Sequence, residues 1–151
     1  MEKTFEIAFN NCIRDKQFDK LPEHKGIYLF RITVEKDDKW DSTIVYIGKA
    51  DGEKGLKGRV NENHEHLSDA RKKVNNAKAN GSNAFLTICY SDENETNEDY
   101  LERIEAALIF ARKPSINDKG KDSFAYHKTT LNISGERKYD LKKQYIVEPA
   151  N

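Results

Sequence analysis

The chain has no long apolar run, no excess of charge of either sign and no cluster of cysteines. Because nothing in its 151 residues resembles a signal peptide or a membrane span, we expect a protein without a membrane partner. It contains only two cysteines, Cys12 and Cys89, and they have neither metal-ligand nor redox-motif spacing. We therefore expect two reduced core thiols in a cytoplasmic protein.

The formal net charge of zero argues against non-specific binding to nucleic acid, which depends on neutralising phosphates. Charge is nevertheless segregated along the chain. Residues 49–78 hold eight Lys or Arg against five Asp or Glu, whereas residues 92–102 hold six acids and no base. This distribution permits one basic face on the folded protein, and it is equally compatible with an ordinary solvated surface.

Three apolar runs rich in β-branched and aromatic residues predict a small antiparallel sheet within a single domain, 1–151. The first two, about 26–34 and 43–49, flank the charged segment 35–39 and predict a β-hairpin; the third covers 84–90. The first run is apolar on both faces, which favours the middle of the sheet. Tyr28 and Tyr46, one on each hairpin strand, share a face if the register allows it.

Helical periodicity predicts helices around this sheet. Phe5, Phe9 and Ile13 recur at helical spacing and predict an N-terminal helix, which ends before Pro22. A helix is predicted to begin near Leu56 and to run through a mostly polar stretch. The basic segment 68–79 is also predicted to be helical. Residues 96–99 have the form of a capping box ahead of a helix that Pro114 closes. Beyond that helix, residues 124–127 and 144–147 are either short strands or segments draped over the core.

Glu105 is an anomaly in the last predicted helix. It lies on or beside the apolar stripe formed by Leu101, Ile104 and Leu108, where a carboxylate is costly unless a cation or hydrogen-bond donors meet it. One explanation is a rim residue satisfied by Arg112 or by a strand backbone. The other is a ligand for a hard cation such as Mg²⁺, which proteins hold with one or two carboxylates plus phosphate and water.

Four short motifs in order along the chain together resemble those of the GIY-YIG nuclease superfamily. They are Gly26-Ile27-Tyr28, Tyr46-Ile47-Gly48-Lys49, Leu56-Lys57-Gly58-Arg59-Val60, and Glu105-Ala106-Ala107-Leu108-Ile109 through Pro114-Ser115-Ile116-Asn117. No single motif is specific, so their combination in sequence carries the resemblance. The similarity covers residues 21–117 and leaves the N-terminal helix and a C-terminal extension, 118–151, outside it.

The resemblance implies an α+β fold with a small central three-stranded antiparallel sheet flanked by helices. It also implies an active site that hydrolyses DNA phosphodiester bonds with Mg²⁺ or Mn²⁺. The residues it would place there are the paired phenols Tyr28 and Tyr46, the phosphate clamp Arg59, the metal ligand Glu105 and the supporting residue Asn117. A phenolate, an arginine and a metal ion suit proton abstraction, phosphate clamping and stabilisation of the leaving oxygen, respectively.

The chain departs from the family pattern one helical turn after Arg59. The family usually has His or Tyr at this position, and this chain has Asn63. On a regular helix His66 lies nearer the face of Arg59 than His64 does, whereas a local bulge would bring His64 in. The third alternative is that neither replaces the family residue, since a lone His in a polar helix is more often solvated. The hairpin turn and the loop before Arg59 also look long for the family. Candidate substrate contacts are Lys49, Lys57 and His66, although Lys49 could equally be a solvated residue at the strand end.

Two main functions follow from these residues. The first is a metal-dependent DNA endonuclease with a tyrosine general base. The second is a weakly active or inactive nucleic-acid-binding module of the same fold, which the neutral charge and Asn63 favour; an α+β domain with neither activity is the third reading. The DNA target stays open, and a dimer is expected only if both strands are cut.

Overall fold

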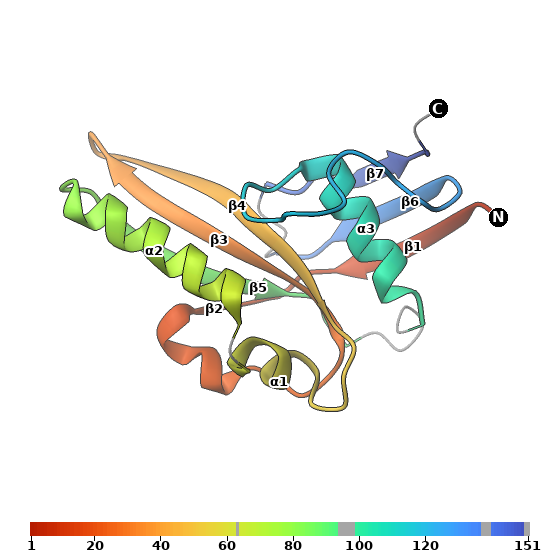
Figure 1. Ribbon diagram of the computed structural model, residues 1–151, viewed down its shortest axis with the longest axis horizontal. Coiled ribbons are helices and arrows are strands. Elements are labelled where there is room, and N and C mark those ends of the chain that lie inside the picture. Colours follow the sequence, from red (N-terminus) through yellow and green to blue (C-terminus); the bar gives the residue numbers. More distant parts are fainter. Residues whose placement is uncertain (63, 94–98, 137–139, 150–151) are drawn as a thin grey trace.

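The computed structural model describes residues 1–62, 64–93, 99–136 and 140–149 (Figure 1). The fold is α+β, with two sheets and helices packed against them. No helix in this described part of the chain combines the length and apolar character needed to cross a membrane.

The larger sheet is antiparallel and contains all three predicted strands. Its order is β2 (Asn11–Arg14), β5 (Asn83–Tyr90), β3 (Gly26–Lys36) and β4 (Lys39–Ala50). The doubly apolar β3 lies in the interior of the sheet, as predicted. The sheet has four strands where three were expected, because β2 adds to the edge of β5.

The β3–β4 hairpin is longer than predicted and its turn is shorter. Lys36 pairs with Lys39, so only Asp37 and Asp38 form the turn. Both have positive φ, 53° and 64°, as a type I′ hairpin turn requires. The prediction of a long turn was wrong because the charged residues around it continue the strands on an exposed arm.

The predicted N-terminal helix was also wrong. Residues there form β1 (Lys3–Ala8), β2 and a 3-10 helix, η1 (Asp15–Lys20). Phe5 and Phe9 fit a helical period, but together with Ile7 they also fit a period of two, and all three are buried. Such a short run is ambiguous in sequence, and the strand is selected by a partner far along the chain.

That partner lies in the C-terminal extension. β1 pairs in parallel with β6 (Thr129–Ser134), which pairs antiparallel with β7 (Gln144–Val147). Of the two alternatives left open for these segments, residues 144–147 form a strand and residues 124–127 do not. The two ends of the chain, which lie outside the motif-bearing region, combine into one mixed sheet.

Helices cover both faces of the larger sheet (Figure 1). α1 (Gly55–Asn61) and α2 (Glu65–Ala79) pack on one face. α3 (Leu101–Arg112) packs on the other face and also meets the smaller sheet, through a shared apolar cluster that includes Ile104, Leu108 and Leu131. The predicted capping box of α3 falls largely on residues 94–98, outside the described residues. The helix ends just before Pro114, as expected.

The outer edge of β4 is covered by the segment after Pro114. Because β4 is the last strand of its sheet, its outward backbone groups need other partners. The Ile116 N–H donates to the Val45 carbonyl at 2.8 Å. The Asn117 side chain accepts from the Ile47 N–H and donates to the Ile47 carbonyl, both at 2.9 Å. One amide side chain thus takes the place of a neighbouring strand.

We predict that Asn117→Ala lowers the free energy of unfolding by about 2–3 kcal/mol, because it leaves two buried backbone groups of Ile47 unpaired. Urea denaturation measures this change. The control is Asn76→Ala on the exposed surface of α2, where we expect less than about 0.5 kcal/mol. Equal effects of the two substitutions would show that the Asn117 amide does not hold the β4 edge.

Candidate active site

The two motif tyrosines lie on the same face of the sheet. In the β3–β4 register Tyr28 pairs with Gly48, and Phe30 pairs with Tyr46. The register shifts just beyond this point, and such bulges commonly re-aim side chains near active sites. The Tyr28 and Tyr46 rings lie 6.1 Å apart between centroids. Tyr28 is fully buried, whereas Tyr46 is 7% exposed and lines a pocket.

Gly48 makes room for Tyr28. A Cβ atom at Gly48 would lie 2.4 Å from Cζ and Oη of Tyr28, well inside van der Waals contact. The tyrosine ring therefore lies across the strand where its neighbour has no side chain. A glycine is needed here for close approach, since its φ is not positive.

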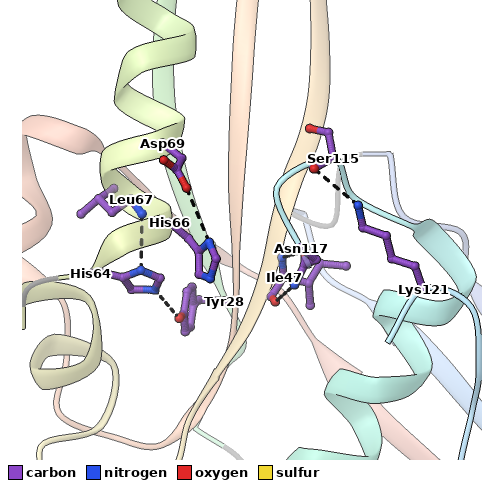
Figure 2. Close-up of polar contacts among 9 residues, drawn as sticks. All are labelled: Tyr28, Ile47, His64, His66, Leu67, Asp69, Ser115, Asn117 and Lys121. Atoms are coloured by element: carbon purple, nitrogen blue, oxygen red, sulfur yellow. Dashed lines mark hydrogen bonds and ion pairs between the residues drawn. The ribbon is translucent and has the colours of Figure 1, made fainter. Parts of the chain in front are cut away.

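His64 reaches Tyr28 because the helix breaks after α1. α1 ends at Asn61 and α2 begins at Glu65, so His64 is the N-cap of α2. Its Nδ1 accepts from the Leu67 N–H at 3.3 Å, and its Nε2 lies 2.7 Å from the Tyr28 hydroxyl (Figure 2). From the sequence, His64 was expected here only through a local bulge in one helix, whereas the structure has two helices with His64 between them. Asn63 itself lies outside the described residues.

The helix cap also sets the tautomer of His64. A neutral ring whose Nδ1 accepts a hydrogen bond carries its proton on Nε2, so His64 donates to the Tyr28 oxygen. Burial, followed by the charges of Arg59 and His66, lowers the pKa of His64 to about 4. The ring is therefore neutral over the physiological range.

The two phenols differ in how readily they ionise. Burial is the main cause of a raised pKa in both phenols, and the rise is large for the fully buried Tyr28. The Arg59 charge lowers both pKa values, and the hydrogen bond between the phenols raises the pKa of Tyr28 while lowering that of Tyr46. Tyr46 is consequently the easier of the two to deprotonate, and it is the one that meets the pocket.

The pocket beside Tyr46 has a volume of about 300 Å³. His66 forms one wall and stacks on the Tyr46 ring, with centroids 4.6 Å apart and planes 22° apart. The opposite wall comes from α3 and the segment after it: Glu105, Ile109, Asn117, Asp118 and Lys119. Asp118 and Lys119 were missed in the sequence, although they directly follow a motif residue.

Glu105 is half-buried on α3, at the junction with β4. Burial raises the pKa of its carboxyl to about 7, while the charge and backbone N–H of Lys49 act in the opposite direction. The strand backbone is thus one of the groups that favour the ionised form of this residue. The Lys49 ammonium itself is 2.7 Å from Asp51, so it is shared with another carboxylate.

Arg59 and Lys57 lie on α1 with different surroundings. Arg59 is exposed, and its charge lowers the pKa values of Tyr28, Tyr46 and His64, which places it beside that cluster. Lys57 borders a separate pocket with Gly58 and other residues of α1. The fold therefore brings Arg59 toward the candidate site and leaves Lys57 outside it.

The described residues contain no group of three or more His, Cys, Asp or Glu side chains able to hold a metal ion. A metal bound here would depend on Glu105 and on water and substrate oxygens. Such a ligand set is usual for Mg²⁺ at phosphoryl-transfer sites. The half-buried Glu105, whose ionised form is disfavoured by burial, fits a hard cation of this kind.

Comparison with models of known families, with curated proteins and with solved structures gives no match. The geometry of the pocket is therefore the basis for a functional argument. Four parts of the chain line this pocket: β4, the start of α2, α3, and the segment after α3.

We predict that Gly48→Ala destabilises the protein by about 2–4 kcal/mol, because a new Cβ forces the buried Tyr28 ring to move. Thermal and urea unfolding measure the loss. Gly52→Ala is the matched control: nothing lies within 4 Å of its added Cβ, so we expect less than about 0.5 kcal/mol. If both variants are equally stable, the described approach of Tyr28 to Gly48 is incorrect.

We predict that Glu105→Gln becomes more stable than wild type as pH rises. The folded-state pKa of about 7 exceeds the ordinary 4.5, so the folded protein holds this proton more tightly than the unfolded chain. The free energy of unfolding of wild type therefore falls between about pH 4.5 and 7, and glutamine avoids the loss. Without metal we expect a gain of about 1–3 kcal/mol at pH 8 and little at pH 4.5.

Unfolding midpoints of both proteins across this pH range provide the measurement. The exposed Glu53→Gln is the control, with a change of less than about 0.5 kcal/mol at either pH. A stability difference for Glu105→Gln that stays constant from pH 4.5 to 8 would mean that its carboxyl is not perturbed by burial.

Proposed function

We propose that this protein is a metal-dependent DNA endonuclease of the GIY-YIG type, which hydrolyses phosphodiester bonds. The observation that carries the proposal is that residues of two motifs, Tyr46 on one side and Glu105 and Asn117 on the other, line one pocket. The buried Tyr28 and His64 rings pack beside Tyr46, and the charge of Arg59 acts on both phenols. Together these side chains can supply the requirements of phosphodiester hydrolysis.

Tyr46 is the general base in this proposal, since it lines the pocket and ionises more readily than Tyr28. It removes the proton from the attacking water. Tyr28 is a positioning residue, because its hydroxyl is held by His64 Nε2–H and directs its own proton toward Tyr46. This donated hydrogen bond stabilises the Tyr46 phenolate.

Arg59 clamps the non-bridging oxygens of the scissile phosphate, and its nearby charge also favours the phenolate form of Tyr46. Glu105 would hold Mg²⁺ or Mn²⁺, and the bound cation would stabilise the leaving oxygen. His66, stacked on Tyr46, and Lys49 lie at the rim as contacts to the DNA. Lys49 would have to exchange its Asp51 partner for phosphate.

The pocket offers one set of catalytic groups in each chain. One encounter would therefore cut one strand, and a double-strand cut would need a second copy or a second encounter. The cytoplasm is the compartment we propose, because DNA and reduced thiols are both found there.

The test is cleavage of supercoiled plasmid by purified protein with saturating Mg²⁺ or Mn²⁺. We expect cleavage whose single-turnover rate rises with pH above neutrality, because burial raises the pKa of the phenol base. His64 should contribute no inflection near pH 6.5, since its pKa is about 4. Tyr46→Phe should lose at least about 100-fold in rate, the usual contribution of a general base.

Glu105→Gln separates catalysis from binding. It should abolish cleavage and retain affinity for DNA in a gel shift, because the amide keeps the shape and loses the charge that holds the metal. DNA binding without cleavage by wild type would instead favour the inactive binding module. Wild-type rates and an unchanged pH profile in Tyr46→Phe would exclude the phenol as base.

A further inference from the structure

The only two cysteines of the chain face one another across neighbouring strands. Cys12 on β2 pairs in register with Cys89 on β5, although the two lie 77 positions apart in sequence. Their sulfur atoms are 3.4 Å apart, and both residues are reduced. The fold has thus brought two sequence-distant thiols into contact.

The backbone at this position already suits a disulfide. Residues directly opposite each other in antiparallel strands have Cα atoms about 4.5–5.5 Å apart. Disulfides span Cα separations of about 4.4–6.8 Å. Closing the remaining gap between the sulfur atoms therefore needs side-chain rotation and no rearrangement of β2 or β5.

The two thiols differ in their access to solvent. Cys12 is half-buried on an edge strand, whereas Cys89 is fully buried in the apolar cluster with Ile27 and Leu29. A dissolved reagent therefore reaches Cys12 first. Cys89 is within reach of the sulfur of Cys12 and protected from the solution, so it can act as the resolving thiol.

We propose that Cys12 and Cys89 are an oxidisable pair that forms a reversible disulfide by exchange with a low-molecular-weight disulfide such as glutathione disulfide. The Cys12 thiolate attacks one glutathione sulfur and expels the first glutathione thiolate. The Cys89 thiol, whose pKa is raised by its hydrogen bond to Cys12 and by burial, then attacks the Cys12 sulfur, and its proton passes to the second glutathione sulfur as that group leaves. Two protein thiols are oxidised, and two electrons and two protons pass to glutathione disulfide, which leaves as two thiols.

The bond would fasten the edge strand β2 to the sheet. It would close a loop that contains β3, β4, α1 and α2, and long loops gain most from closure because the unfolded chain is restricted most. Cys89 packs on the sheet face opposite to Tyr28. The disulfide therefore stabilises the fold without entering the candidate active site, and this inference does not depend on the proposed nuclease activity.

The experiment is mass spectrometry of the native full-length protein after incubation with glutathione disulfide. We expect a monomer that has lost two hydrogen atoms, a linked peptide pair containing both cysteines, and full reversal by dithiothreitol. Its unfolding temperature should exceed that of the reduced protein by about 10 °C. A lasting glutathione adduct, or no reaction under conditions that oxidise the urea-unfolded chain, would overturn the proposal.

Two variants test the order of attack. Cys89→Ala keeps the accessible thiol and loses the resolving one, so it should accumulate a glutathione adduct on Cys12. Cys12→Ala should give no product and no rise in unfolding temperature. An adduct on Cys89 in the Cys12→Ala variant would contradict the assigned roles, and a wild-type disulfide between two molecules would contradict the intramolecular pair.

Discussion

The outer edge of β4 has to find its hydrogen-bond partners within the protein, and much of the candidate site is built from the residues that supply them. Asn117 binds both backbone groups of Ile47, and Ile116 binds the carbonyl of Val45. The backbone N–H of Lys49, farther along the same strand, lowers the pKa of the Glu105 carboxyl. The hydrogen bonds along the edge of β4 therefore hold α3 and the segment after it next to the strand that carries Tyr46.

The other wall of the site depends on a second buried polar contact. His64 hydrogen-bonds the Leu67 N–H at the start of α2 and the Tyr28 hydroxyl in the sheet. One buried imidazole therefore caps a helix, and both of its ring nitrogens have hydrogen-bond partners. Its folded-state pKa of about 4 lies below the ordinary 6.5. The stability from this neutral ring is therefore complete above pH 6.5 and is lost as pH falls through about 4.

Burial disfavours the charged forms of several side chains at the candidate site. The pKa values of Tyr46 and Glu105 are raised, and this is common where a protein holds groups for chemistry at the expense of stability. The smaller sheet helps to support this arrangement. Its apolar residues pack against α3, which carries Glu105, so the two ends of the chain contribute to the site without touching it.

The sequence by itself determined the three long strands, the middle position of β3 and the helix that carries Glu105, because these follow from local periodicity and residue type. The candidate site residues came from the resemblance of the four motifs to a known family. Tertiary structure alone placed His64 against Tyr28 and His66 against Tyr46, since both positions depend on where the first helix ends and the next begins. It also turned the expected N-terminal helix into strands, because Phe5 fits both periods and only pairing with Leu131 separates them. Register and long-range pairing are properties of two segments, and neither segment alone encodes its partner.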